Sequence, residues 1–211
     1  MIPLLDDNKS LKRIGIATSA IIVLNVIMFL IFPDRTIPVN ISSVTNLQSF
    51  TLFTLAGIIS LFLHANILHI GFNMLYLYVF GTPLENKIGK FKFLLIYFIS
   101  GIAGFYLYYL TAATNLPVIG ASGAISGVIA AYLVLLPKSK ILSLWPILWI
   151  IRLIYIPAWI FIGFWIVSQL ISLTLLQGDG IAYQSHIGGI IIGLIIGLIY
   201  LKASRKNLIL A

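Results

Sequence analysis

The chain has 211 residues, 61% of them hydrophobic and only 9% charged, and its mean hydropathy is +1.11. Soluble domains are roughly half apolar and about one quarter charged, so this composition excludes a water-soluble globular fold and favours one helical membrane domain. The net charge of +8 does not indicate a nucleic-acid partner, because the basic residues form short clusters at the ends of apolar segments instead of lining one face.

The first apolar segment, residues 14–32, predicts a retained transmembrane helix that follows a cytoplasmic tail at residues 1–13. Its length is close to the ~20 apolar residues that cross a bilayer, and no small-x-small cleavage site of a signal peptide follows it. Residues 33–68 predict a long first loop, which is polar and turn-rich at its start. Within this loop, the apolar residues 50–63 are expected to dip into the membrane.

Five further helices are predicted, so that residues 14–201 form one all-α, polytopic bundle of six transmembrane helices. Between the fourth and fifth helices, residues 141–155 contain a proline, an arginine and interfacial aromatic residues, which favour a cytoplasmic surface loop. Pro157 can occupy the first turn of the fifth helix. Residues 202–211 are a cytoplasmic C-terminal tail. The five helices are expected at about residues 69–84, 93–111, 122–137, 157–176 and 181–201.

The distribution of basic residues supports this topology independently of any motif. Six spans put both termini on one side of the membrane, and all 13 Lys and Arg residues except Arg35 then fall on that side. Because cytoplasmic loops carry an excess of Lys and Arg, that side is assigned as the cytoplasm. The sequence thus indicates a multi-pass membrane protein with both termini in the cytoplasm. It shows no transit peptide or recognisable organelle address, so the expected location is the cell membrane of a bacterium or archaeon.

Few polar side chains interrupt the spans, and each is a candidate functional residue because it is costly to place in lipid. His64 and His69 precede or begin the second helix, Ser122 begins the fourth, and His186 lies near the start of the sixth. These three helices all run inward from the outer face. The four side chains are therefore expected at one depth.

Small residues predict that the fourth and sixth helices touch. They recur at every fourth position, which lets two helix backbones approach closely in lipid. Contact of these helices brings Ser122 within hydrogen-bond reach of His186, whose neutral imidazole can accept the hydroxyl proton. The positions are Gly123, Gly127 and Ala131 on the fourth helix and Gly189, Gly193 and Gly197 on the sixth.

The expected catalytic unit is a dyad, because no acidic residue is placed to orient His186 from within the membrane. Asp179 is the nearest in sequence, seven residues away in a loop. His69 and Asn73 lie one helical turn apart on one face, and with the backbone N–H of Ser122 they could stabilise a developing oxyanion by roughly 3 kcal/mol each. No cofactor and no metal site is predicted, and the absence of cysteine excludes thiolate nucleophiles and zinc–thiolate sites.

Each residue also has an ordinary explanation. A serine between glycines usually serves packing, a buried histidine is more often structural or part of a proton relay, and Asn73 could bridge two helices. Their joint occurrence at one depth, beside glycine faces that bring their helices together, favours the catalytic interpretation. Glu85 is expected to cap or anchor the inner end of the second helix.

Four separate blocks of the sequence, in order over about residues 60–200, resemble the rhomboid proteases. The serine block alone would be a weak signal, whereas four blocks in sequence are a strong one. The blocks are His64-Ala65-Asn66 with His69 and Asn73, Gly81 through Glu85 to Gly89, Gly120-Ala121-Ser122-Gly123, and Ser185-His186-Ile187-Gly188-Gly189.

The resemblance implies a six-helix core, a dyad of Ser122 and His186, and oxyanion donors at His69 and Asn73, with His64, Gly120 and Gly123 in support. It further implies substrates that are themselves transmembrane segments, cut near the outer face. By the same resemblance, Phe72 and an aromatic residue of the fifth helix such as Trp165 form a substrate gate. The Trp-Arg pair that rhomboids often carry in the first loop is missing from residues 50–63.

Two other functions compete with proteolysis. A catalytically inactive rhomboid-like protein that binds membrane clients would lack the nucleophile or the base, and this chain has both. A small transporter or proton channel using the three histidines as a relay would be expected to have broken or inverted-repeat helices and an intramembrane carboxylate, neither of which the sequence indicates. The oligomeric state is not indicated by the sequence.

Overall fold

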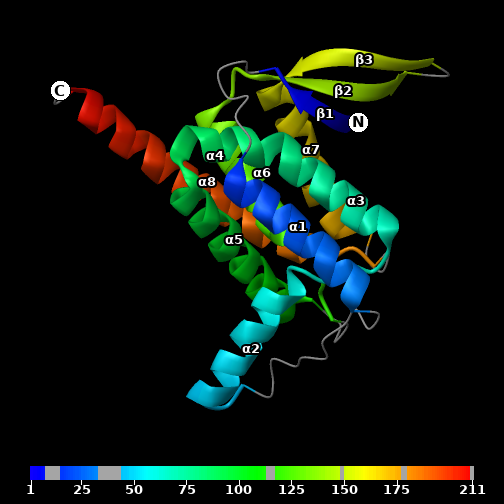
Figure 1. Ribbon diagram of the computed structural model, residues 1–211, viewed down its shortest axis with the longest axis vertical. Helices are drawn as coiled ribbons and strands as arrows, with labels where there is room; N and C mark the ends of the chain where they lie inside the picture. The colour runs from blue at the N-terminus through cyan, green and yellow to red at the C-terminus, as the bar shows by residue number, and fades with distance from the viewer. Residues whose placement is uncertain (8–14, 33–43, 113–116, 148–149, 177–179, 210–211) are drawn as a thin grey trace.

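The computed structural model describes residues 1–7, 15–32, 44–112, 117–147, 150–176 and 180–209. Helices make up most of the described chain and pack as a bundle, with a small sheet at one end and α2 projecting at the other (Figure 1). The helical elements are α1 (Ile16–Ile31), α2 (Leu47–Ser60), α3 (Ile67–Tyr76), the π-helical turn η3 (Leu77–Gly81), α4 (Thr82–Ile88), α5 (Lys90–Thr111), α6 (Ser122–Leu135), α7 (Ala158–Leu175) and α8 (Tyr183–Ile209).

Four helical stretches of the described chain are long and apolar enough to cross a membrane: Ile67–Ile88, which joins α3, η3 and α4, and then Lys90–Thr111, Ala158–Leu175 and Tyr183–Ser204. The remaining two predicted spans correspond to α1 and α6, which are apolar but have only 16 and 14 residues. At 1.5 Å per residue, both are shorter than the ~30 Å hydrocarbon core. The helical membrane class is confirmed, whereas the count of six transmembrane helices stays a prediction.

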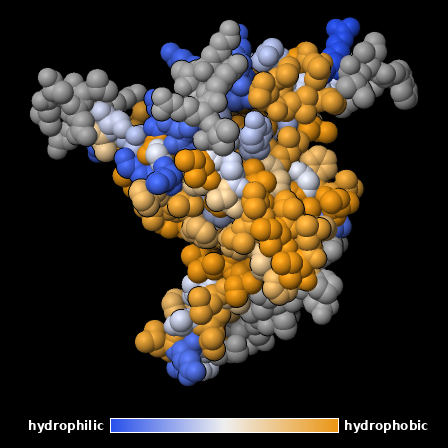
Figure 2. Space-filling view, in the orientation of Figure 1, coloured by the Kyte–Doolittle hydropathy of each residue, from blue (hydrophilic) through white to orange (hydrophobic). Residues whose placement is uncertain are grey.

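Side-chain hydropathy on the molecular surface fits a protein surrounded by lipid. Figure 2 shows hydrophobic residues over most of the bundle, with hydrophilic residues gathered toward the end of the bundle that carries α4 and the sheet, and at the tip of α2. The exposed residues include many large aliphatic and aromatic side chains on α1, α7 and α8. Such a surface would be an aggregation liability in water and is suited to contact with acyl chains.

A three-stranded antiparallel sheet lies at one end of the bundle. Strands β1 (Ile2–Asp6), β2 (Lys140–Ile147) and β3 (Ile150–Pro157) pair in the order β1-β2-β3. These segments were predicted as a tail and a surface loop, so the sheet is a local addition to a fold that is otherwise helical. The isoleucine-rich segments β2 and β3 favour an extended hairpin. The other edge of β2 pairs with β1, which is distant in sequence, and local sequence patterns do not reveal such long-range pairing.

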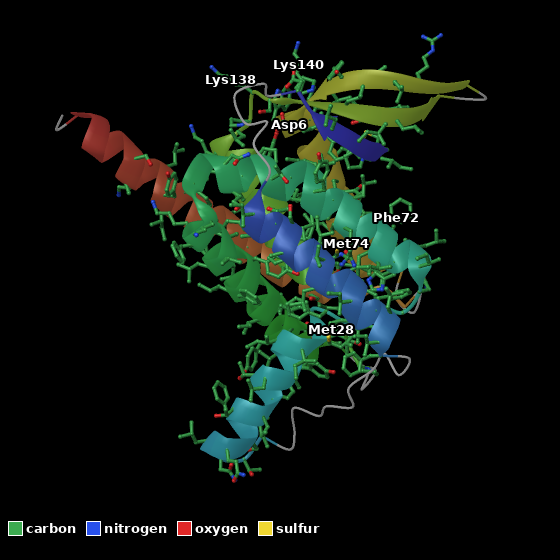
Figure 3. The ribbon with its side chains drawn as sticks, viewed as in Figure 1. Asp6, Met28, Phe72, Met74, Lys138 and Lys140 are labelled. Atoms are coloured by element: carbon green, nitrogen blue, oxygen red, sulfur yellow. The ribbon has the colours of Figure 1, made fainter. Side chains whose placement is uncertain are left out.

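Acidic side chains near the N-terminus tie the sheet to the bundle. Asp6, the last residue of β1, accepts a hydrogen bond from the hydroxyl of Tyr132 on α6. Asp7 accepts a hydrogen bond of 2.8 Å from the backbone N–H of Lys140. Asp6, Lys138 and Lys140 lie together at this end, whereas Phe72 lies farther from the sheet on α3 (Figure 3). The N-terminal residues are therefore on the same side of the bundle as the α6–α7 connection.

Glu85 of α4 anchors the first turn of α1. One carboxylate oxygen accepts a 2.9 Å bond from the N–H of Ala17, and the other accepts 2.8 Å bonds from the N–H and the hydroxyl of Thr18. A carboxylate at a helix N-terminus satisfies free N–H groups and complements the helix dipole. The expectation that Glu85 serves as an anchor is confirmed, but the helix it caps is α1.

The glycine faces of α6 and α8 meet, as the spacing predicts. A methyl group built on Gly189 would collide with the carbonyl oxygen of Gly123, and one on Gly193 would collide with that of Gly127. Backbones this close leave no room for any side chain larger than hydrogen at these positions. The close packing fixes the distance between the N-terminal ends of the two helices, where the candidate site lies.

Candidate active site

Ser122 is the first residue of α6, and the preceding loop is held in a conformation that suits glycine. Gly120 has a φ of 108°, a region that residues with a Cβ rarely adopt. Its N–H donates a 2.9 Å hydrogen bond to the carbonyl oxygen of Ser60 at the end of α2. Because the first N–H groups of a helix have no acceptor within it, the N–H of Ser122 points out of the start of α6.

His186 of α8 reaches Ser122 across the glycine contact. Its Nε2 lies 2.9 Å from the Oγ of Ser122, and both side chains are half-buried. The ring of Tyr183, one turn earlier on α8, packs edge-on against the imidazole with centroids 6.0 Å apart. The contact that the sequence predicts between these two residues is thus present, although they are 64 positions apart.

The other nitrogen of His186 has a partner that the sequence analysis missed. Its Nδ1 lies 2.7 Å from the Oε1 of Gln169 on α7. The sequence contained a signal for this residue, because Gln169 is an amide within an apolar span, and a polar side chain in such a span is a candidate functional residue in the same way as a histidine. The sequence-based prediction considered only acidic residues as hydrogen-bond partners of His186, and Gln169 is a neutral amide. Asp179, the acid nearest in sequence, lies outside the described residues.

His69 and Asn73 of α3 converge on the loop before Ser122. A Cβ built on Gly120 would lie 2.6 Å from His69 Nε2 and 3.5 Å from Asn73 Nδ2, so these two nitrogens are close to the loop backbone. The Nδ2 of Asn73 is buried and has no hydrogen-bond partner among the described residues. An unpaired buried donor is costly and indicates a position prepared for an acceptor that binds there.

His64 lies behind this pair, in the connection between α2 and α3. It is fully buried, its ring centroid is 5.0 Å from that of His69, and its Nε2 accepts a 3.5 Å hydrogen bond from the N–H of Ala121. Burial and the neighbouring His69 lower the pKa of His64 to about 4. A neutral His64 can accept this bond from the backbone before Ser122, and its supporting role in the site stays a prediction.

The other residues predicted for the site are Gly123 and the two gate candidates, Phe72 and Trp165. Gly123 forms part of the α6–α8 contact, where a Cβ would lie 2.5 Å from the hydroxyl of Ser185. Phe72 on α3 is 47% exposed, whereas Trp165 on α7 is partly buried against the main hydrophobic core. The substrate gate formed by these two residues stays a prediction.

Comparison with known proteins matches these residues to one family. A family profile described as the rhomboid domain matches residues 46–203. The rhomboid protease AarA of Providencia stuartii is 36% identical over 164 residues, which cover 70% of this chain and 56% of that protein. The mitochondrial rhomboid protein 1 of Saccharomyces cerevisiae is 34% identical over 157 residues, covering 70% of this chain and 42% of that protein.

A third relative carries the enzymatic class in its name. The rhomboid-type serine protease 2 of Emericella nidulans is 30% identical over 151 residues, which cover 69% of this chain and 27% of that protein. The chain thus matches about half or less of the length of these relatives. The matched profile nevertheless includes every site residue described above, from His64 to His186. On the profile match and these identities, the chain belongs to the rhomboid family.

Proposed function

We propose that the protein is an intramembrane serine endopeptidase that cleaves transmembrane segments of other membrane proteins near the outer face. The observation that carries the proposal is the 2.9 Å approach of His186 Nε2 to Ser122 Oγ, beside the unpaired amide donor of Asn73. A serine hydroxyl becomes an effective nucleophile only when a neighbouring base takes its proton, and the imidazole is placed to do so.

In the proposed reaction, Ser122 Oγ attacks the carbonyl carbon of the scissile peptide bond while its proton passes to His186 Nε2. The tetrahedral intermediate collapses when the same proton is returned to the leaving amine, which leaves an ester on Ser122. A water molecule then attacks the ester, again with His186 as base, and releases the carboxylic acid and the free serine. His186 returns the proton taken from water to Ser122 Oγ as the ester breaks, so the imidazole accepts and donates one proton in each half of the cycle.

Three donors would stabilise the negative charge on the attacked oxygen. The Nδ1 of His69 accepts a 3.4 Å hydrogen bond from the N–H of Ala65, so the proton of a neutral His69 is on Nε2, the atom beside Gly120. Asn73 Nδ2 and the N–H of Ser122 are the other two. Each such donor contributes roughly 3 kcal/mol to transition-state stabilisation.

Substrate chemistry follows from the environment of the site. Peptide bonds inside a transmembrane helix have their carbonyls hydrogen-bonded and are poor targets, so the substrate must unwind locally. Helix-breaking small residues near the cleavage site are the expected preference. Cell-membrane location, cytoplasmic termini and an outward-facing Ser122 belong to the same proposal and rest on the distribution of basic residues.

The direct test is reconstitution in liposomes with a single-span model substrate. Wild type is expected to cleave, whereas Ser122→Ala and His186→Ala are expected to lose activity by at least about 10³-fold. Ser126→Ala is the matched control, because its hydroxyl donates a 2.7 Å bond to the carbonyl of Ser122 within α6 and makes no hydrogen bond to His186 among the described residues, and it should cleave normally. Substrate bound without cleavage by wild type would instead support the client-binding function.

A further inference from the structure

We propose that Gln169 is a positioning residue that holds His186 in the tautomer able to accept the proton of Ser122. The proposal rests on the proposed protease function and extends it from a dyad to a neutral Gln-His-Ser chain. These three side chains come from three helices, α7, α8 and α6. Gln169 Oε1 lies 2.7 Å from His186 Nδ1, and His186 Nε2 lies 2.9 Å from Ser122 Oγ. Gln169 would not touch the substrate but would act through the imidazole.

The orientation of the Gln169 amide is set by its neighbour. Its Nε2 donates a 3.3 Å hydrogen bond to the Oγ of Ser168. The hydroxyl proton of Ser168 is itself given to the carbonyl oxygen of Trp165 at 2.6 Å, so Ser168 Oγ is available to Gln169 as an acceptor. The amide nitrogen is thus engaged on α7, and the oxygen is the atom left facing His186.

An oxygen acceptor beside Nδ1 selects one form of the neutral imidazole. The proton must lie on Nδ1, where it is donated to Gln169, and the lone pair then lies on Nε2, facing the hydroxyl of Ser122. In the other tautomer, two lone pairs would oppose each other at the Gln169 contact and Nε2 would carry a proton toward Ser122. That form cannot act as the base.

An amide suits this position better than a carboxylate would. An ionised acid in a membrane-spanning helix must be desolvated, whereas a neutral amide accepts the same hydrogen bond with a smaller penalty. Helices α6 and α7 contain no Asp, Glu, Lys, Arg or His. The structure places Ser122, Gln169 and the phenol ring of Tyr183 against the imidazole of His186. Neither α6 nor α7 can supply an acidic or basic side chain to it.

The kinetic test uses two substitutions at this position. Gln169→Met removes the acceptor at similar volume and should lower kcat roughly 10- to 100-fold with little change in KM, because the imidazole then loses both its preference for the productive tautomer and the acceptor that stabilises the imidazolium. Gln169→Glu supplies a charged acceptor that stabilises the imidazolium, so it should retain activity and move the acidic limb of the kcat–pH profile to higher pH. Ser172→Ala, one turn along α7, is the control and should behave as wild type.

A merely structural role for Gln169 predicts different results. If Gln169 only packed α7 against α8, Gln169→Met would raise KM or lower the thermal midpoint, and Gln169→Glu would not shift the pH profile. Either a wild-type kcat in Gln169→Met or an unshifted profile in an active Gln169→Glu would overturn the proposal. Thermal unfolding of each variant in detergent identifies any that fails to fold.

The tautomer itself can be read without any substrate. The chain has three histidines, so ¹⁵N-labelled imidazole spectra in detergent micelles are simple, and a His186→Gln variant assigns the signal of interest. Wild type should have the proton of neutral His186 on Nδ1, and Gln169→Met should show a mixture of tautomers. A proton on Nε2 in wild type would overturn the proposal even if the protein proved to be a protease. If the protein cleaves nothing, the spectra still decide the assignment of Gln169.

Discussion

At the scale of single residues, the clearest feature is that the buried amide nitrogen of Asn73 finds no hydrogen-bond partner in the part of the chain that the structure describes. Such a group lowers the stability of the free protein, because its desolvation is not offset by a hydrogen bond. A position that is unfavourable in the free state and useful in the transition state is typical of a catalytic site. Stability and activity should therefore respond in opposite directions when the amide is removed.

Asn73→Leu is expected to reduce kcat by about 10²- to 10³-fold while leaving the thermal midpoint unchanged or raised. The loss follows from the missing oxyanion donor, and the stability follows from removal of an unsatisfied amide. Parallel measurement of cleavage kinetics and thermal unfolding in detergent checks both. A large drop in the midpoint with a proportionate loss of kcat would mean that Asn73 serves the fold instead.

His64 should make the folding stability depend on pH. Its pKa is 6.5 when unperturbed and about 4 in the folded protein. Between those values the unfolded chain binds a proton that the folded chain does not, so stability is complete above pH 6.5 and falls as the pH falls toward 4, by on the order of 3 kcal/mol in all.

The measurement is the free energy of unfolding of wild type and His64→Gln from pH 7.5 to 4.5. The glutamine does not titrate, so its curve should be flatter over that range. Equal slopes for the two proteins would show that other groups, and not His64, determine the acid sensitivity.

Some residues of the candidate site could be predicted from the sequence, and one could not. Ser122, His186, His69 and Asn73 were predicted to lie together and do so, since intramembrane polarity and glycine spacing are both visible in the sequence. Their catalytic roles stay predictions. Gln169 was missed, because a neutral amide is not usually considered as a partner for histidine, and which helix faces Nδ1 depends on packing that sequence does not reveal.

At the scale of elements, the glycine contact between α6 and α8 holds Ser122 and His186 within hydrogen-bond distance. Gly189→Ala should push the helices apart, because its methyl group meets the backbone of Gly123. Both the thermal midpoint and kcat are expected to fall. Gly163→Ala on α7, where a Cβ meets nothing within 4 Å, is the control and should leave both unchanged. Normal activity in Gly189→Ala would mean that the site tolerates a wider separation.

The carboxylate of Glu85 should matter for folding and much less for chemistry. Glu85→Ala leaves three buried donors of α1 without their acceptor and is expected to cost roughly 2–4 kcal/mol. Glu85→Gln keeps part of the arrangement and should lose less. Unfolding measurements on the two variants give the comparison, and kcat of any folded fraction should stay near that of wild type. A loss of kcat with intact stability would contradict the anchoring role.

Element boundaries were predicted to within a few residues for most helices, since apolar length and flanking lysines define them. The β1–β2–β3 sheet was not predicted, because pairing of Ile2–Asp6 with a hairpin at residues 140–157 joins segments far apart in the chain. Helix α2 was expected only as an apolar part of the first loop. Its capping box at Asn46 and Ser49 is a local signal that could have identified it.

At the scale of the whole molecule, the sheet determines which segments lie at the same end of the bundle, and the distribution of charge alone does not determine this. Pairing of β1 with β2 puts the N-terminal residues and the α6–α7 connection at the same end, whereas α2 lies at the opposite end (Figure 1). If the sheet end is cytoplasmic, as the basic residues indicate, α2 and the start of α6 face outward. The proposed site then opens toward the outer face.

Because the native chain has no cysteine, single-cysteine variants test this topology directly. Lys138→Cys, near β2, and Gln48→Cys, in α2, are both exposed positions. In intact cells a membrane-impermeant maleimide should label Gln48→Cys, whereas Lys138→Cys should react only after the membrane is opened. The reverse pattern would contradict the proposed orientation, and labelling of both from one side would contradict the membrane arrangement.

The claim on which the whole account depends is that His186 activates Ser122 as a nucleophile. The most direct measurement is the site and rate of phosphonylation by a fluorophosphonate, with the adduct located by peptide mass spectrometry. Wild type should carry the adduct on Ser122, Ser122→Ala should carry none, and His186→Ala should react at least about 10²-fold more slowly. An adduct on another residue, or equal rates in wild type and His186→Ala, would contradict the account.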